Sequence, residues 1–220
     1  MGLFYANLNP VLQACCALFA GVVCWIACRQ IPWQKWQAPT VFSAWCASII
    51  VLVLTWRMRI PLANGVDLHL LGLALFYLMF ARPLAILGIS IAVMAYTYEY
   101  QGNWANLGVN IVLLAILPSY LSDFLLTASK LYLPRHLFVY LLGNGFFFTV
   151  LVNGLVACSA LALREFMTIG KAIPLDSYAY ALLLCWGEAF LTGFIITIFT
   201  IYRPDWVLSF DDATYLNSQV

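Results

Sequence analysis

Residues 68–96 read LHLLGLALFYLMFARPLAILGISIAVMAY, and this stretch decides how the chain is built. It is predominantly apolar and is interrupted by Arg82-Pro83. Proline breaks a helix because it lacks an amide N–H and disfavours helical geometry in the residue before it. We therefore predict two short helices here, at about 68–80 and 84–96, in place of one long helix.

The composition of the whole chain indicates that its solvent is lipid. Of the 220 residues, 65% are hydrophobic and 9% are charged, whereas a soluble domain carries about 25% charged residues. The mean hydropathy is +0.94. Too few charges remain to cover a water-facing surface, so we expect a single membrane domain over residues 1–220. The net charge of +1 gives no indication of a nucleic-acid partner.

Seven apolar segments approach the length of about 20 residues that a spanning helix needs. We therefore predict an all-α integral membrane protein with about seven transmembrane helices. The expected spans are about 11–27, 40–56, 68–80, 84–96, 107–126, 137–163 and 178–201.

The basic residues favour one orientation, because cytoplasmic loops carry an excess of Lys and Arg. With the N-terminus outside, six basic residues fall on the inside and four on the outside. The inside set is Arg29, Lys35, Arg82, Lys130, Arg135 and Arg203, and the outside set is Arg57, Arg59, Arg164 and Lys171. We predict a multi-pass protein of the cell membrane with its N-terminus outside and its C-terminus in the cytoplasm.

Three polar residues lie within or near the ends of the expected spans. Glu188 lies well inside the last one, where a carboxylate costs about 2.5 to 3.5 kcal/mol on insertion scales. Two roles fit it: a structural carboxylate bonded to another helix or to an Arg, and a part in substrate passage or conformational coupling. Asn110 is expected to form an interhelical hydrogen bond, worth about 0.6 kcal/mol. Asp123 lies near the expected inner boundary and is expected to be interfacial.

His69 is one of only two histidines, and it stands where a membrane helix is expected to begin. Two interpretations are open: an interfacial histidine bonded to a backbone carbonyl, and a transition-metal ligand, for which imidazole is the commonest side chain. One histidine does not make a site. The candidate co-ligands are Asp67, Asn64 and Met1 with its amino group. His136, in a basic loop, is expected to be solvated.

No motif of a soluble enzyme is present. The chain has no Gly-x-x-x-x-Gly-Lys-Ser/Thr loop, no His-Glu-x-x-His and no Gly-x-Ser-x-Gly. It is therefore not expected to bind ATP itself or to be an enzyme. An intramembrane enzyme is the weakest alternative, because Ser122 and Ser159 have no evident histidine partner.

The seven cysteines lie in or beside apolar runs, and their odd number does not indicate a disulfide framework. Cys24 and Cys28 share a helix face. Small apolar filling and a soft-metal pair both fit this spacing.

Four short patches, in order between about residues 60 and 208, carry a resemblance to a known family. Residues 65–72 (GVDLHLLG) are similar to its Gly-Thr-Ser-x-His-Leu-x-Gly, and residues 107–111 (LGVNI) to its Leu-Gly-x-Asn-Ile. Residues 187–192 (GEAFLT) are similar to its Gly-Glu-Ala-x-x-Thr, and residues 203–205 to its Arg-Pro-Asp. The chain thus resembles the substrate-capture membrane components of energy-coupling-factor (ECF) ABC transporters for cobalt and nickel, the CbiM/NikM type.

The resemblance implies a bundle like that of the ECF substrate-capture components, with an outward N-terminus. It implies uptake of a transition-metal ion as the substrate, captured near the outer face, and no tightly bound cofactor. It also implies two kinds of partner, an ECF transmembrane (T) component and cytosolic ATPase subunits. Asn110, Glu188 and Arg203, which fall in the matching patches, are expected to have coupling or structural roles.

One departure concerns the metal site. The family uses the free N-terminus and a histidine at position two, together with the histidine that matches His69. Here position two is Gly2, and Asp67 replaces the family's serine. Three interpretations follow: a changed metal preference, a different substrate, or a degenerate site. The last makes a non-transporting membrane scaffold or assembly factor the alternative function.

Overall fold

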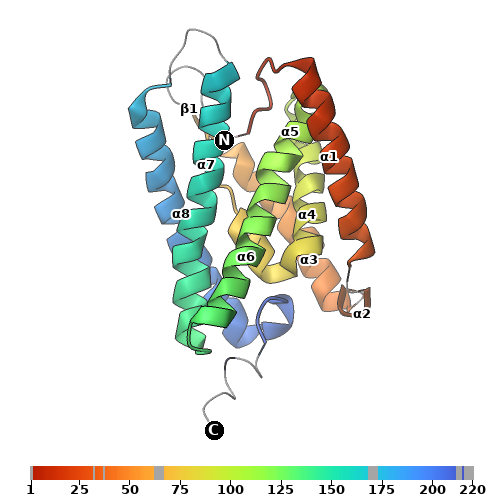
Figure 1. The fold of residues 1–220 in the computed structure, drawn as a ribbon. Helices are drawn as coiled ribbons and strands as arrows, with labels where there is room; N and C mark the ends of the chain where they lie inside the picture. Colours follow the sequence, from red (N-terminus) through yellow and green to blue (C-terminus); the bar gives the residue numbers. More distant parts are fainter. Residues whose placement is uncertain are drawn as a thin grey trace.

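The computed structural model describes residues 2–31, 33–36, 38–61, 67–167, 173–211 and 215, and it is a bundle of long helices (Figure 1). Two short strands, β1 and β2, pair antiparallel with Ile60 opposite Leu68. In chain order the elements are α1 (Pro10–Arg29), α2 (Trp33–Trp36), α3 (Pro39–Arg57), β1 (Ile60–Pro61), β2 (Asp67–Leu68), α4 (Leu73–Glu99), the 3-10 turn η2 (Trp104–Asn106), α5 (Leu107–Ile111), the π-helical η3 (Val112–Ile116), α6 (Leu117–Tyr132), the π-helical η4 (Val139–Phe147), α7 (Phe148–Met167), α8 (Leu175–Tyr202) and the 3-10 turn η5 (Pro204–Trp206).

Within the described ranges, six helical stretches are long and apolar enough to span a bilayer. They are Pro10–Arg29, Pro39–Arg57, Leu73–Glu99, Trp104–Tyr132, Val139–Met167 and Leu175–Tyr202. The all-helical membrane fold is confirmed, but the expected number of seven helices is wrong. Of the expected segments 68–80 and 84–96, residues 73–80 and 84–96 lie in one element, α4, whereas Leu68 belongs to β2 and residues 69–72 are not helical. The first segment therefore holds too little helix to span alone.

The expected break in α4 is nevertheless present, directly before Arg82. Ala81 has φ 59° and ψ 173°, which is not helical. A Cβ built on Gly88 would lie 2.5 Å from Cζ of Phe76, although twelve residues of straight helix span about 18 Å. The chain therefore folds back at Ala81. Residues 73–80, which we call the half-helix, pack against residues 82–99.

Between Arg59 and Arg82 the chain passes from one end of the bundle to the other. At one end, the Arg59 guanidinium lies 5.4 Å from the centre of the Tyr100 ring, which joins the ends of α3 and α4. At the other end, Arg82 Nη2 lies 3.3 Å from Oε1 of Gln30, just after α1. The N-terminal residues and the segment after α8 consequently lie at opposite ends of the molecule (Figure 1).

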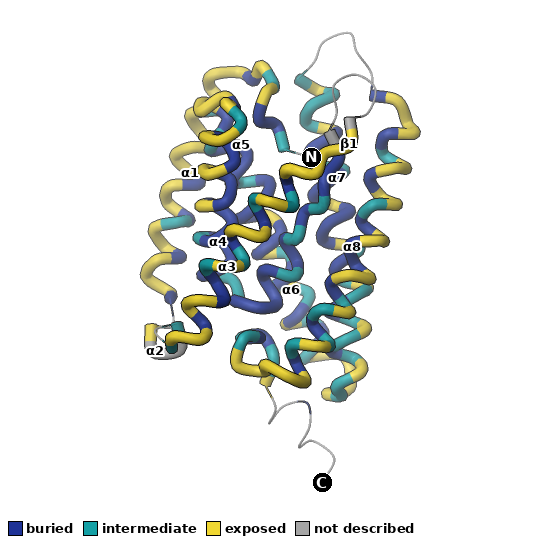
Figure 2. The backbone as a smooth tube through the Cα atoms, turned by 180° about the vertical axis from the view of Figure 1, so that it is seen from behind, coloured by how far each residue is buried: buried dark blue, intermediate teal, exposed yellow. Residues whose placement is uncertain are grey.

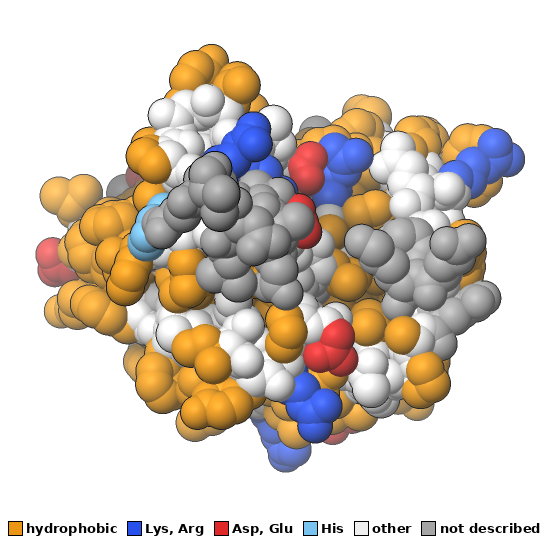
Figure 3. Space-filling view, turned by 90° about the horizontal axis from the view of Figure 1, so that it is seen from below, with side chains coloured by type: hydrophobic (Ala, Val, Ile, Leu, Met, Phe, Trp, Pro, Cys, Tyr) orange, Lys and Arg blue, Asp and Glu red, His pale blue; other side chains and the backbone are white. Residues whose placement is uncertain are grey.

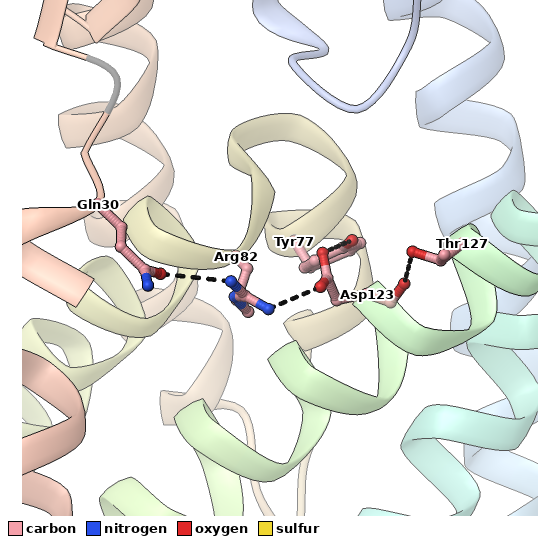
Figure 4. Close-up of polar contacts among 5 residues, drawn as sticks. All are labelled: Gln30, Tyr77, Arg82, Asp123 and Thr127. Atoms are coloured by element: carbon pink, nitrogen blue, oxygen red, sulfur yellow. Dashed lines mark hydrogen bonds and ion pairs between the residues drawn. The ribbon is translucent and has the colours of Figure 1, made fainter. Parts of the chain in front are cut away.

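One carboxylate on α6 fixes the fold-back (Figure 4). Asp123 accepts a hydrogen bond from the Tyr77 hydroxyl on the half-helix, 2.9 Å away, and forms an ion pair of 2.8 Å with Arg82 beyond the turn. Both side chains of the pair are partly exposed, at 30% for Arg82 and 37% for Asp123. The interfacial position expected of Asp123 is thus only part of its role, because it also ties the two halves of α4 together.

Burial is concentrated on α4, at the centre of the bundle (Figure 2). The outer helices expose large apolar side chains instead, such as Leu18 and Phe19 on α1 and Phe190 and Phe194 on α8. An apolar outer surface on helices of spanning length is what a bilayer requires.

We predict that Ala81→Gly stabilises the protein by about 1 kcal/mol, because only glycine adopts this backbone conformation without strain. Unfolding of the purified protein in mixed detergent micelles measures the change. The control is Ala95→Gly, at an exposed position inside the helix after the fold-back. It should lower stability by roughly 0.5 to 1 kcal/mol. Equal destabilisation by both changes would mean that α4 is continuous.

Candidate functional site

His69 lies between β2 and the half-helix and is only 3% exposed. Burial lowers the pKa of His69 well below the ordinary value of 6.5. The positive charges of the chain's amino group and of Arg59 lower this pKa further, whereas the hydrogen bond to Leu70 opposes the shift. The ring is therefore neutral at pH 7. Its Nδ1 lies 3.0 Å from the carbonyl oxygen of Leu70. The tautomer with the proton on Nδ1 keeps that bond and leaves Nε2 as the ligating nitrogen.

This geometry is compatible with both interpretations of His69. The ring is bonded to a backbone carbonyl, as expected for a structural histidine. In metal sites, however, such a bond is the usual way of orienting a histidine ligand.

Glu188 of α8 holds the residues that follow His69. Its carboxylate is 3% exposed and accepts hydrogen bonds from the backbone N–H of Leu71, at 2.9 Å, and of Gly72. The indole N–H of Trp56 donates to the Leu71 carbonyl at 3.0 Å. Gly72 has φ 67°, a left-handed conformation that favours glycine.

Glu188 therefore caps the start of the half-helix, where free amide groups and the helix dipole favour a negative charge. These hydrogen bonds fit the structural one of the two roles open for Glu188. Its partners, however, are backbone amides two and three residues after His69, and not an arginine.

The segment after α8 caps the other end of the half-helix. The backbone N–H of Leu208 donates to the Met79 carbonyl at 2.8 Å, and the Ser209 hydroxyl donates to the Leu78 carbonyl at 2.5 Å. Arg203 begins the turn that brings this segment back. Its guanidinium lies 5.5 Å from the centre of the Trp206 ring. Arg203 thus begins the segment that closes the end of the half-helix opposite to the end held by Glu188.

Two asparagines of the fourth span hold the N-terminal segment. Asn110 is fully buried, and its Oδ1 accepts a hydrogen bond of 2.7 Å from the N–H of Leu3. Asn106 donates from Nδ2 to the carbonyls of Leu3, at 2.8 Å, and Ala6, at 2.7 Å. The observed partner of Asn110 is thus the N-terminal segment, whereas the partner suggested by the sequence was another spanning helix. Asn106 was not among the expected site residues, although its spacing of four residues from Asn110 was a usable signal.

Trp56 joins the N-terminal segment to His69. Its ring centre lies 5.6 Å from that of His69 and 6.5 Å from that of Phe4. Phe4 also packs on Tyr96, with 4.7 Å between ring centres. One buried indole therefore contacts both parts of the chain from which ligands are expected.

The space for a side chain at position two is already occupied. A Cβ built on Gly2 would lie 2.2 Å from Cε2 of Phe4. A larger residue at this position requires the Phe4 ring to move. Where the family has a histidine side chain at position two, this chain has Gly2, and the Phe4 ring occupies the space instead.

The remaining expected ligands are not described in full. Asn64 and Met1 lie outside the described residues, and Asp67 is described only as backbone of β2, paired with Pro61. Among the described residues, no group of three or more His, Cys, Asp or Glu side chains is placed to hold a metal ion. All seven cysteines are free.

The fold and the site define a polytopic membrane protein that buries one neutral imidazole beside its N-terminal segment. A family model described as the cobalt uptake substrate-specific transmembrane region, CbiM, matches residues 6–206. The chain belongs to this family. It is a cobalt-uptake transmembrane component of an ECF transporter and not an enzyme, which confirms the resemblance. A search of curated proteins gave no match.

We predict that Glu188→Gln lowers the free energy of unfolding by about 1 to 3 kcal/mol, because the buried amides of Leu71 and Gly72 lose a charged acceptor. Thermal unfolding in detergent measures the change. Glu99→Gln, at the exposed end of α4, is the control and should change stability by less than about 0.5 kcal/mol. Equal effects of the two substitutions would contradict the capping role of Glu188.

Proposed function

We propose that the chain captures a divalent transition-metal ion, with cobalt indicated by the family, between His69 and the chain's N-terminus. One observation carries this proposal: Asn106 and Asn110 hold Leu3 in place, and Phe4 packs on the same indole that contacts His69. The N-terminal amino group is two residues before Leu3. The fold thus supports a site in which a chain terminus and a buried imidazole meet.

The proposed ligands are mainly nitrogen. Nε2 of His69 is the first, the amino group of Met1 the second, and the backbone amide of Gly2, once deprotonated, the third. Asp67 and Asn64 are the candidate oxygen ligands. Imidazole and amine nitrogens suit cobalt and nickel better than magnesium or calcium. With glycine at position two the site has one imidazole fewer than the family's, so the metal is held less tightly.

Release of the ion requires partners, because the chain has no ATP-binding loop. We propose an ECF transmembrane component and cytosolic ATPase subunits in this role. The end of the bundle that carries the segment after α8 displays both basic and acidic side chains (Figure 3). The proposed orientation places this end in the cytoplasm, and His69 then belongs to the outer half.

Whether the metal site is degenerate remains open, and one observation favours degeneration. The Phe4 ring fills the position-two space, as expected if the site had degenerated. Metal binding distinguishes an active site from a degenerate one.

We predict that His69→Ala weakens Co²⁺ binding at least tenfold, or by about 1.4 kcal/mol, because it removes the buried imidazole ligand. Isothermal titration of protein tagged at its C-terminus, with a free N-terminus, measures this change. The control is His136→Ala, which removes the other histidine. His136 bonds only locally, through Nδ1 to the N–H of Phe138 at 3.2 Å. This control should bind within twofold of the unmodified protein. Equal Co²⁺ binding by both variants would exclude His69 as a ligand. Absence of Co²⁺ binding by the unmodified protein would indicate a degenerate site.

We also predict that Gly2→His combined with Phe4→Ala tightens Co²⁺ binding at least tenfold, because the pair adds an imidazole and frees the space for it. Gly2→His alone should gain less, since the Phe4 ring must move. Phe4→Ala alone is the control and should not tighten binding. A double variant that binds no better than this control would place the N-terminus away from the metal.

A further inference from the structure

The first helix, α1, lies at the edge of the bundle (Figure 1), and an open groove separates much of it from residues 82–99 of α4. Among the six described spans, α1 buries the smallest share of its apolar stretch, 17% against 61% for α4. We call this space the α1 groove. Its volume is about 680 Å³, and its walls include Ala14, Ala17, Gly21, Leu87, Ile91 and Met94.

Polar contacts join α1 to the rest of the bundle near the two ends of the α1 groove. At one end, Nε2 of Gln13 donates a hydrogen bond of 2.8 Å to Oδ1 of Asn106. Beyond the other end, Nη2 of Arg82 donates to Oε1 of Gln30 at 3.3 Å, just after α1. The helix is thus tied at its ends, and the space between the ties is not filled by side chains of the described chain.

The α1 groove offers little to a polar occupant. The Ser90 hydroxyl in its wall donates to the Ile86 carbonyl at 2.6 Å and lies 3.6 Å from Sγ of Cys24, and Gln13 is bonded to Asn106. Among the described residues of the lining, no buried side-chain nitrogen or oxygen lacks a partner. An occupant therefore needs no hydrogen-bonding group, and an apolar space of this kind does not hold water.

The α1 groove opens toward the bilayer. Ile91 and Met94 in its wall are 40% and 39% exposed, and Leu18 and Val22, which flank it on α1, are also exposed. Exposed apolar side chains in the middle of spanning helices face hydrocarbon. Lipid is therefore what the surroundings bring to the groove, and an empty groove would forfeit the dispersion contacts of its walls.

The length of the α1 groove suits an acyl chain. The α1 residues that line it, from Pro10 to Cys24, extend over about 21 Å of helix. The chains of one leaflet fill about half of a hydrocarbon core of about 30 Å, so one chain fits along the groove. A spanning helix of a partner would instead extend past both ends, where Gln13 and Gln30 join α1 to the bundle.

We propose that the α1 groove binds one acyl chain of a bilayer phospholipid, which packs α1 against residues 82–99 of α4. Lipid tails are as apolar as leucine, so the chain takes the place that large side chains take elsewhere in the bundle. At one end of the groove, Gln13 bonds to Asn106, which also holds the carbonyls of Leu3 and Ala6. The bound chain thus supports the helix that carries the N-terminal segment. This lipid site is independent of the proposed metal capture.

The substitution Gly21→Leu tests the site by filling the α1 groove. Gly21 lies in the wall of the groove, and a Cβ built on it meets no atom within 4 Å. The matched control is Gly187→Leu. Gly187 is also an exposed glycine within a spanning helix, α8, and a Cβ built on it also meets no atom within 4 Å, but it does not line the groove.

The delipidated protein in detergent is titrated with dioleoyl phosphatidylglycerol, and separately with dioleoyl phosphatidylethanolamine, and bound lipid is counted by native mass spectrometry. We expect the unmodified protein and Gly187→Leu to bind one lipid more tightly than any further lipid, with either headgroup. Gly21→Leu should bind this lipid at least tenfold more weakly. The lipid should also raise the melting temperature of the first two proteins and not that of Gly21→Leu, because a ligand of the folded state stabilises it.

A comparison of chain lengths on the unmodified protein covers the case in which Gly21→Leu does not fold. Dihexanoyl phosphatidylglycerol has the same headgroup as the dioleoyl lipid, but its chains are too short to lie along the α1 groove. We expect it to bind at least tenfold more weakly.

Equal lipid binding by Gly21→Leu and Gly187→Leu would overturn the site. Binding that depends on the headgroup and not on the chains would overturn it too, because the groove contacts only the chain. A second copy of the protein, or an added transmembrane partner subunit, that binds in place of the lipid and is lost in Gly21→Leu would overturn the lipid as the occupant.

Discussion

The hydrogen bonds between Glu188 and the backbone of Leu71 and Gly72 are the interaction on which the rest of the site depends. A carboxylate inside a bilayer is costly unless it has strong partners, and the free amides at the start of a helix are such partners. Because these amides belong to the second and third residues after His69, the same bonds restrain the segment that carries the imidazole. The last helix and its extension thus hold both ends of the half-helix, at Gly72 and at Leu78.

The fold-back at Ala81 explains why the molecule needs this cap. A half-helix of eight residues is about 12 Å long and cannot span a bilayer core of about 30 Å. The residues just before the half-helix therefore enter the bundle in a non-helical conformation, and their backbone N–H and C=O groups need hydrogen-bond partners. Such backbone is tolerated within a membrane only where protein surrounds it. Trp56 and Glu188 provide these partners, and His69 enters the protein interior as a result.

Features that depend on residues close together in the sequence could be predicted. Apolar runs predicted the spans, the Arg82-Pro83 dipeptide predicted the break, and the cost of burial singled out Glu188 and Asn110. What could not be predicted was the identity of distant partners. The Asn110 contact to Leu3 crosses 107 residues, and the Glu188 contact to Leu71 crosses 117. The number of spanning helices was wrong for the same reason, since folding back is a tertiary event.

The central claim is that the metal lies between the N-terminus and His69. The X-ray absorption spectrum of the protein loaded with one equivalent of Co²⁺ tests it most directly. The account predicts nitrogen and oxygen neighbours only, with the outer-shell scattering of one imidazole that His69→Ala removes. Sulfur neighbours in a spectrum that His69→Ala leaves unchanged would contradict it, because they would place the ion at the cysteines, such as Cys24 and Cys28 of α1, and away from His69.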